Sequence, residues 1–497
     1  MHHLFLKNLR NNLTAETASM KEYDFILIGT GSGMEIASIM LQENPKQKAA
    51  IIDKDEPGGI CLTRGCIPSK ILIYPAELVR TVQNVKDFGI TAQIEGIDFQ
   101  KIMNRMRNLI KRDIQNLRQG LSNSKNIDYY TTTAEFIAPY TLKVDNETIK
   151  SRMIFLCTGS RPVIPQISGL DKLDYLTSDT ILKLERLPKS VAIVGGGYIA
   201  AEYGHFLAAM GSNVTIIGRN PQFIPEEEPE ISALARKELQ KHMTIITNHE
   251  ASKAEKTTDG LKKLVALDRS TRKETEISAE EILIAAGRGP NTDLLHPEKA
   301  GVKTDKNGWV VVNEYLETSQ PNVWALGDAD GNYLFKHVAN HEALVVYFNA
   351  VMKRKVKVDY HAVPHAVFTD PEIASVGLRE KEAIEKFGES NVQIGFQRYE
   401  DTAKGEAMGL KDCFVKVIVL NERTRILGAH IIGPYASVLI QEVINLMYTA
   451  DQSAQPLIAA MHIHPALSEV VARAFNSLMP PKMYHHVLEE HYGLTTA

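Results

Sequence analysis

Short runs of branched apolar residues, each followed by a glycine-rich turn and a helical pattern, occur twice along the chain. The first begins at Tyr23 in YDFILIGTGSGMEIASIML, and the second begins at Ser190 in SVAIVGGGYIAAEYGHFLAAMG. Continuous apolar runs of this length suit strands that are buried on both faces of a parallel sheet. A further branched run follows each segment, ending at Asp53 and at Arg219. The pattern predicts two βαβ units of the type that binds a dinucleotide.

The rest of the chain follows other patterns. A helical stretch runs from about Ile71 to Leu121, and strand-to-turn signals appear near Thr158 and Gly287. From about Val363, alternating strands give way to helices. We therefore expect an α/β protein with two Rossmann-like dinucleotide-binding domains and a C-terminal α+β domain.

Composition narrows the class of protein. A length of 497 residues suggests about three domains, and a net charge of -4 gives no sign of a nucleic-acid or membrane partner. There is no apolar run long enough for a transmembrane helix. The four cysteines are too few for a secreted disulfide scaffold, which favours a reducing cytoplasmic location. Residues 1–20 are expected to form a disordered extension.

The first glycine motif places Gly29 in a tight turn and Gly31 where backbone approaches a pyrophosphate. Met34 stands where the G-x-G-x-x-G pattern calls for glycine or alanine, and the neighbouring Gly33 is expected to relieve the crowding. Asp53 ends the next strand, at the position that holds a ribose hydroxyl. Alone, the motif is also compatible with an ordinary glycine-rich turn.

The second motif fits the pattern better, with Gly195, Gly197 and Ala200 at the three positions. The following strand ends at Gly218 and Arg219, so the acid that binds the 2′-hydroxyl of NAD is missing. An arginine at this point favours the 2′-phosphate of NADP, although Arg219 is also compatible with a plain surface cation.

The segment GGICLTRGCIPSK carries two cysteines, Cys61 and Cys66, where a helix is expected to begin. A helix N-terminus stabilises a thiolate, which favours a redox pair. A zinc site needs further ligands nearby, and no second ligand pair stands out, so no metal is expected. Cys157 and Cys413 lie in apolar, strand-like segments and are interpreted as buried, inert thiols.

Near the C-terminus, His464 is followed five residues later by Glu469 in HIHPALSE. A carboxylate that fixes the tautomer of an imidazole makes an acid–base pair, although the segment is also compatible with a simple helix start. The further histidines His485, His486 and His491 are interpreted as a solvated face.

Taken together, these motifs resemble the class I pyridine nucleotide–disulfide oxidoreductases. The resemblance runs from about Tyr23 to about Phe475. It rests on motifs that fall in the family's order, namely GTGSG, GGICLTRGCIPSK, CTGSRP, GGGYIAAE, AAGRGPN, TSQPNVWALGDAD, FTDPEIASVG and HIHPALSE.

The resemblance implies an FAD-binding domain in two segments, 21–164 and 293–360, around an NAD(P)-binding domain, 165–292. Residues 361–497 would form a dimerisation domain. The cofactors would be FAD with NADPH or NADH, and the active unit would be a homodimer.

The family's functional residues carry over by position. Cys66 would be the thiol beside the flavin, and Cys61 the outer thiol that exchanges with the substrate. Lys70 and Glu202 would form an ion pair near the flavin, and His464 and Glu469 would complete the site of the other subunit. Tyr198 would be a gate displaced by nicotinamide. The remaining residues expected to bind the cofactors are Gly29, Gly31, Gly33, Asp53, Gly59, Thr158, Gly159, Gly195, Gly197, Arg219, Gly287, Arg288, Gly327 and Asp328.

The substrate is less closely defined. Segments such as SRPVIPQISGLDKLDYLTSDT and the tripeptide HPA resemble mycothione reductase, which favours NADPH-dependent reduction of a small-molecule disulfide. His462 is a feature similar to dihydrolipoamide dehydrogenase, the NAD-linked alternative with a lipoyl-domain partner. Pro225 stands where the family's NADPH enzymes often place a second arginine. The absence of a C-terminal cysteine pair argues against mercuric reductase.

Overall fold

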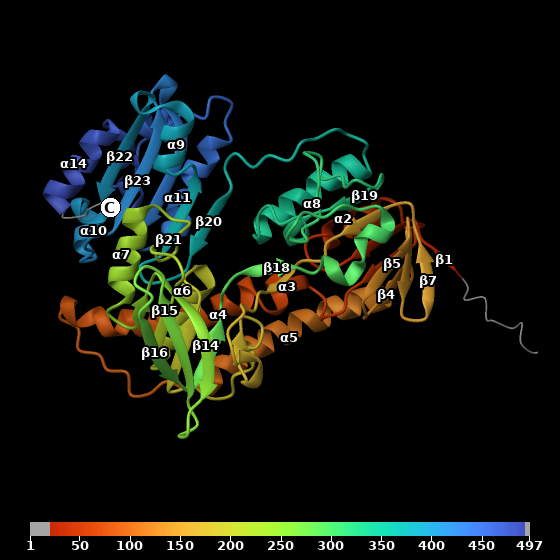
Figure 1. Ribbon diagram of the computed structural model, residues 1–497. Helices are drawn as coiled ribbons and strands as arrows, with labels where there is room; N and C mark the ends of the chain where they lie inside the picture. Colours follow the sequence, from red (N-terminus) through yellow and green to blue (C-terminus); the bar gives the residue numbers. More distant parts are fainter. Residues whose placement is uncertain (1–19, 493–497) are drawn as a thin grey trace, which may run out of the picture. The chain divides into compact units, whose positions relative to one another are not determined.

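The computed structural model describes residues 20–492 (Figure 1). The chain divides into two compact units, each assembled from three segments. Of the described residues, the first unit holds 20–63, 110–161 and 288–358, and the second holds 64–109, 162–287 and 359–492. The extension expected over 1–20 lies outside the described residues except for its last position.

The centre of the first unit is a five-stranded parallel sheet in the order β19-β8-β2-β3-β4. Its strands are β2 (Phe25–Ile28), β3 (Ala49–Ile52), β4 (Ile127–Tyr130), β8 (Ile154–Leu156) and β19 (Val323–Ala325). A second, mostly antiparallel sheet has the order β1-β7-β6-β5. It contains β1 (Lys21–Glu22), β5 (Ala134–Ala138), β6 (Thr141–Val144) and β7 (Glu147–Lys150).

Both faces of β2 are buried because alternate side chains point to opposite sides of a strand. Ile26 and Ile28 pack in a cluster with residues of β5, β6 and β7. Phe25 and Leu27 pack on the opposite face with residues of α2 (Met34–Glu43) and α8 (Lys336–Ala350). This two-sided burial explains the uninterrupted apolar run in the sequence.

The second unit begins with α4 (Cys66–Asn84) and contains another parallel sheet, in the order β10-β17-β11-β12-β13. Its strands are β10 (Leu176–Thr177), β11 (Ser190–Val194), β12 (Asn213–Ile217), β13 (Thr244–Ile246) and β17 (Glu281–Ile284). An antiparallel sheet of β14 (His249–Lys256), β15 (Lys262–Asp268) and β16 (Glu274–Ala279) packs on one face. Helix α6 (Tyr198–Met210) contacts α4 and β12.

The C-terminal part of this unit is a five-stranded antiparallel sheet in the order β20-β21-β24-β23-β22. Its strands are β20 (Pro364–Val367), β21 (Ile373–Gly377), β22 (Val392–Arg398), β23 (Phe414–Leu420) and β24 (Arg425–Ile432). Helices α11 (Ala436–Met447) and α13 (Ser468–Asn476) pack against it around an apolar core. The neighbouring helices are α7 (Pro229–Leu239), α9 (Glu380–Phe387) and α14 (Pro481–Tyr492).

The expected α/β class, with two Rossmann-like sheets and an α+β C-terminal region, is confirmed. The helical stretch expected over 71–121 proves to be two helices, α4 and α5 (Phe99–Asn123). Residues 64–109 cluster with the second unit, because α4 packs on α6. The remaining helices and strands are short: α3 (Gly59–Thr63), α10 (Ala403–Ala407), α12 (Gln455–Ala459), β9 (Ser160–Pro162) and β18 (Arg288–Pro290).

Candidate active site

The first glycine turn leaves bare backbone where a nucleotide is expected. Gly29 has a φ of +104°, and a Cβ there would stand 2.0 Å from the carbonyl oxygen of Cys157. A Cβ on Gly59 would stand 2.6 Å from the Cα of Gly31, so the two glycine segments touch backbone to backbone. Side chains at these positions would close the surface that a pyrophosphate needs.

The close helix–strand contact of the motif falls on Gly33 instead of on residue 34. A Cβ on Gly33 would stand 2.4 Å from the Sγ of Cys157 and 2.8 Å from Leu27. Met34 begins α2 and packs at the edge of the apolar cluster. Gly33 therefore provides the close packing that the pattern assigns to position 34, and Met34 is tolerated there.

Asp53 follows β3 and is held by the same turn. Its Oδ2 accepts hydrogen bonds from the backbone N–H of Thr30 at 2.8 Å and from the Thr30 hydroxyl at 2.5 Å. The Thr30 hydroxyl in turn accepts the N–H of Gly58 at 3.0 Å. The carboxylate expected to bind a ribose is thus fixed at the carboxyl end of the sheet.

Several buried polar groups of the first unit gather around Asp328. Ser160 donates a hydrogen bond to Asp328 and accepts one from Arg288 at 2.7 Å. Burial raises the pKa of Asp328, and burial raises that of Asp330 to about 6. The hydroxyl of Thr158 and the Oδ2 of Asp330 are buried and find no hydrogen-bond partner among the described residues. Polar groups left in this state fit a site that a polar ligand completes.

Three of the glycines expected to bind a cofactor belong to the segments around these groups. Each has a positive φ, a backbone conformation that favours glycine over other residues. Gly159, Gly287 and Gly327 have φ values of +65°, +118° and +63°. The N–H of Gly327 donates to the buried carboxylate of Glu342 at 2.5 Å.

The second glycine turn repeats the construction of the first. Gly195 has a φ of +137°, and a Cβ there would stand 2.1 Å from the carbonyl oxygen of Ala285. Gly197 precedes α6 and has open space around it, whereas Ala200 is fully buried against the sheet. The turn can therefore receive a second dinucleotide in the second unit.

A second arginine, which the sequence analysis did not identify, lies beside Arg219. The guanidinium of Arg269, in the turn between β15 and β16, donates to the backbone oxygen of Arg219 at 3.3 Å. Both arginines are exposed. The turn is held in place because the N–H of Arg269 bonds the oxygen of Asn248, whose own N–H bonds Asn220.

The two cysteines of the expected redox pair lie on consecutive helices. Cys61 lies within α3 of the first unit, and Cys66 is the first residue of α4, which belongs to the second. Cys66 therefore stands at the N-terminus of a 19-residue helix. The positive end of the helix dipole stabilises a thiolate at this point.

Lys70 lies one turn further along α4 and pairs with Glu202 of α6. Its ammonium stands 2.8 and 2.9 Å from the two carboxylate oxygens of Glu202. The same ammonium lies 4.5 Å from the centre of the Phe368 ring, and the N–H of Phe368 donates to Glu202 at 3.2 Å. Lys70 and Glu202 are 132 positions apart in the sequence. Together with Phe368, they bring three segments of the second unit into contact.

His464 and Glu469 are in contact, as expected. The Nδ1 of His464 donates to Oε1 of Glu469 at 3.0 Å, and the N–H of Ala466 donates to Oε2 at 3.1 Å. The hydrogen bond from His464 is the main reason that the pKa of Glu469 is lowered. The side chain of His464 is 67% exposed, so its Nε2 edge is open to a second molecule.

The other two thiols are poor nucleophiles. Burial raises the pKa of Cys157 well above its usual range, and it raises that of Cys413 to about 12. His485 differs from the expected solvated face: its Nε2 donates to Glu380 at 2.7 Å. His486 is 65% exposed, and the side chain of His491 lies outside the described residues.

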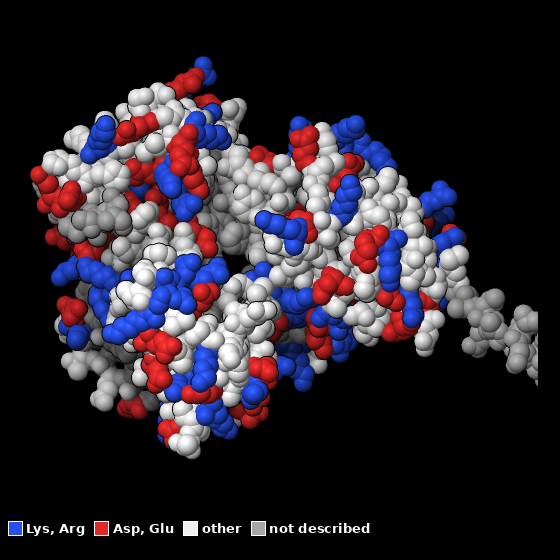
Figure 2. Space-filling model, viewed as in Figure 1, with Lys and Arg blue, Asp and Glu red and all other residues white. Residues whose placement is uncertain are grey.

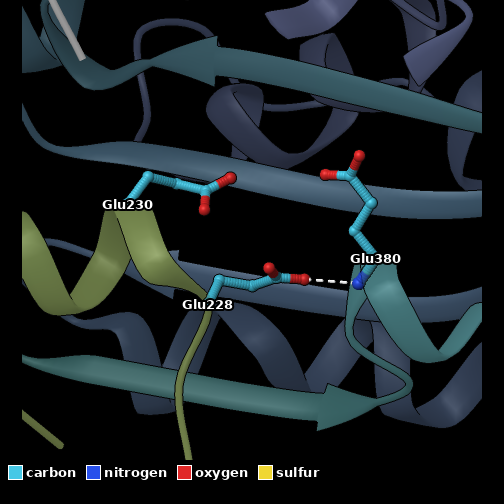
Figure 3. Close-up of side chains that lie close together, drawn as sticks. All are labelled: Glu228, Glu230 and Glu380. Atoms are coloured by element: carbon cyan, nitrogen blue, oxygen red, sulfur yellow. Dashed lines mark hydrogen bonds between the residues drawn. The ribbon is translucent and has the colours of Figure 1, made fainter. Parts of the chain in front are cut away.

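Among the described residues, Glu228, Glu230 and Glu380 form a group of buried carboxylates with the spacing of metal ligands (Figure 3). The ammonium of Lys416, which Figure 3 does not draw, stands 3.2, 2.5 and 2.7 Å from these carboxylates. Burial acts to lower the pKa of Lys416, but the three carboxylates outweigh it and raise the pKa. The cluster thus already holds a cation, and it joins α7, α9 and β23.

None of the described helices is both long and apolar enough to span a bilayer.

The geometry agrees with comparisons to known proteins. The pyridine nucleotide-disulphide oxidoreductase family matches residues 23–343, and its dimerisation domain matches residues 363–475. The mycothione reductase of Mycobacterium tuberculosis is 36% identical over 476 residues, which cover 92% of this chain and 100% of that protein. The dihydrolipoyl dehydrogenase of Synechocystis is 35% identical over 474 residues, covering 91% and 98%.

A solved structure shows the same architecture. The HOCl-induced flavoprotein disulfide reductase RclA from Escherichia coli superposes with a TM-score of 0.80 at 27% identity. The alignment covers 91% of this chain and 99% of that one.

Proposed function

Because the chain belongs to the pyridine nucleotide-disulphide oxidoreductase family, whose flavoenzymes use FAD and NAD(P)H, we propose that it reduces a small-molecule disulfide with NADPH. Residues 21–164 and 293–360 would bind FAD, 165–292 would bind NADPH, and 361–497 would form the dimer. Bound FAD supplies the two-electron link between the nicotinamide and the cysteine pair. The bare glycine turns, Asp53 and the unsatisfied groups near Asp328 suit these ligands.

The thiol chemistry would run through Cys61 and Cys66. The thiolate of Cys61 attacks one sulfur of the substrate, so that the substrate S–S bond breaks and a mixed disulfide forms. The first substrate thiol leaves with a proton from His464. The thiolate of Cys66 then attacks the sulfur of Cys61, so that the mixed disulfide breaks, the second substrate sulfur leaves as a thiolate and a Cys61–Cys66 disulfide remains. Two electrons from NADPH reduce this disulfide again.

The proton donor would come from a second copy of the chain. The match to a dimerisation domain supports this, as do the exposed side chains of Met461 and Ile463, which precede His464 in the same loop. Glu469 keeps the Nδ1–H of the imidazole in place and leaves Nε2 to exchange the proton. A reducing compartment such as the cytoplasm would supply both the thiol pool and NADPH.

The observation that carries the choice of NADPH is that Arg219, which follows β12, is in contact with Arg269 of the β15–β16 turn. Residue 218 is a glycine, so no carboxylate at that position repels a phosphate, and the guanidinium group of Arg269 lies against the backbone of Arg219. Figure 2 shows Lys and Arg side chains gathered over α7 and the neighbouring ends of β15 and β16. Guanidinium groups bind phosphate with charge-assisted hydrogen bonds.

The second candidate is a dihydrolipoyl dehydrogenase that works with NAD and a lipoyl domain. The 35% identity to the Synechocystis enzyme favours it, as does His462 two residues before His464. The direction of the reaction would then be toward NADH, since the substrate couple decides the direction.

Steady-state reduction by the purified enzyme separates the two. NADPH and NADH are compared with lipoamide, mycothione, glutathione disulfide and bis-γ-glutamylcystine. We expect a clear preference for NADPH, with one small disulfide turned over well. Efficient NADH-linked turnover of lipoamide, with little activity on the others, would establish the second candidate instead.

A further inference from the structure

Tyr198 is held from outside its own domain. It is the first residue of α6, directly after the second glycine turn. Its ring stacks on that of His365 in β20, with the ring centres 5.4 Å apart and the planes inclined by 24°. A strand of the C-terminal sheet therefore covers the residue that is expected to move when nicotinamide enters.

A buried carboxylate anchors the ring of His365. The side chain of Glu227 is fully buried, and its Oε1 accepts a hydrogen bond from the Nε2 of His365 at 2.7 Å. Its Oε2 accepts one from the hydroxyl of Ser375 at 2.6 Å. Burial acts to raise the pKa of Glu227, but the contact with His365 and the other donors outweighs it and lowers the pKa. The group thus remains a carboxylate that needs its donors.

We propose that Glu227 and His365 form a latch that holds the Tyr198 side chain in its closed position. The inference rests on the proposed function and on the role that the family resemblance implies for Tyr198, a gate that nicotinamide displaces. Opening the gate must break the ring stack between Tyr198 and His365, and the hydrogen bond to Glu227 keeps His365 in the position where that stack forms. The apparent affinity for the nucleotide is then lowered by the fraction of molecules that are closed. His365 and Glu227 are positioning residues that act through Tyr198.

The latch predicts a gain of affinity, which damage to the fold would not produce. His365→Ala removes both the ring and the donor, and we expect the dissociation constant for NADP⁺ to fall about tenfold, equivalent to about 1.4 kcal/mol. His365→Phe keeps a ring and loses the donor, so its effect should be intermediate. Titration of the FAD-loaded enzyme measures this constant, and rapid mixing should show the limiting rate of flavin reduction within about twofold of the wild type.

The chain offers a matched control. The ring of His361 also meets a tyrosine ring, Tyr448, at 4.7 Å, and its Nδ1 contacts the carboxylate of Asp359 at 2.6 Å. His361→Ala should leave the dissociation constant unchanged. Glu227→Gln is a second route to the same result, because it weakens the anchor while keeping the shape of the side chain.

An unchanged or weakened affinity in both His365→Ala and Glu227→Gln would overturn the latch. Titration with both NADP⁺ and NAD⁺ keeps this result apart from the choice of nucleotide. A wrong assignment of the nucleotide would appear as tighter NAD⁺ binding in every variant. A wrong latch would appear as equal constants in variant and wild type, with either nucleotide.

Discussion

At the scale of single residues, Glu469 sets the orientation of His464. We expect Glu469→Gln to lower the rate of disulfide reduction about 10²-fold, because general acid–base catalysis contributes at least that factor. Reduction of the flavin by NADPH should be unaffected. Glu489→Gln, at an exposed position of α14, is the control. Equal losses in both half-reactions would contradict this role.

The charge of Glu469, and with it the contact to His464, depends on pH in a defined direction. The folded-state pKa of Glu469 is lowered, mainly by its hydrogen bond to His464. A carboxylate whose pKa is lowered by folding stabilises the folded protein at pH values above its ordinary pKa. This stabilisation is lost as the pH falls through the lowered pKa. The carboxylate therefore stays charged at neutral pH, and the effect of Glu469→Gln should persist across the range from about pH 6 to 8.

Substitution of Arg269 tests whether the protein prefers NADPH to NADH. Arg269→Ala should raise the KM for NADPH about tenfold, because a hydrogen bond to a charged group contributes about 1.5–3 kcal/mol. The KM for NADH should change little, since NADH lacks the 2′-phosphate. Lys256→Ala, an exposed cation at the other end of the same small sheet, should change neither constant. Parallel changes for both nucleotides would show that Arg269 does not read the phosphate.

At the scale of elements, Lys416 of β23 joins α7 and α9 through the carboxylates drawn in Figure 3. Lys416→Met should destabilise the protein by about 3–5 kcal/mol, because it leaves buried carboxylates without their ammonium. Denaturant unfolding measures the loss. Lys237→Met, which breaks an exposed pair with Asp412, should cost less than about 1 kcal/mol. Equal effects would mean that the cluster adds little to stability.

Some of these elements and contacts could be predicted from the sequence, and others could not. The strands with the clearest apolar runs, such as β2 and β11, were predicted correctly because both of their faces are buried. The Lys416 cluster was missed because its residues come from three distant segments and follow no period. Arg269 was missed for a related reason: it lies in a turn between antiparallel strands, and its neighbour Arg219 is 50 positions away.

At the scale of the whole molecule, the proposed dimer has a strict test. Cys61→Ser and His464→Asn should each give an inactive homodimer, because every site of the proposed dimer would need Cys61 from one subunit and His464 from the other. When the two chains are co-expressed, hybrid dimers regain one intact site, so roughly a quarter of the wild-type activity should return. Sedimentation would confirm that the active species is a dimer. No recovery in a purified hybrid would show that both residues act within one chain.

The contact between Gly33 and Cys157 also bears on how this turn changes over evolutionary time. The sulfur, together with Leu27, occupies the space that a side chain at position 33 would need, so position 33 cannot gain a side chain while Cys157 stays fixed. Among homologues, positions 33, 34 and 157 should therefore vary together. Sequences with a side chain at 33 should carry a smaller residue at 157, and ancestral reconstructions should place that change first.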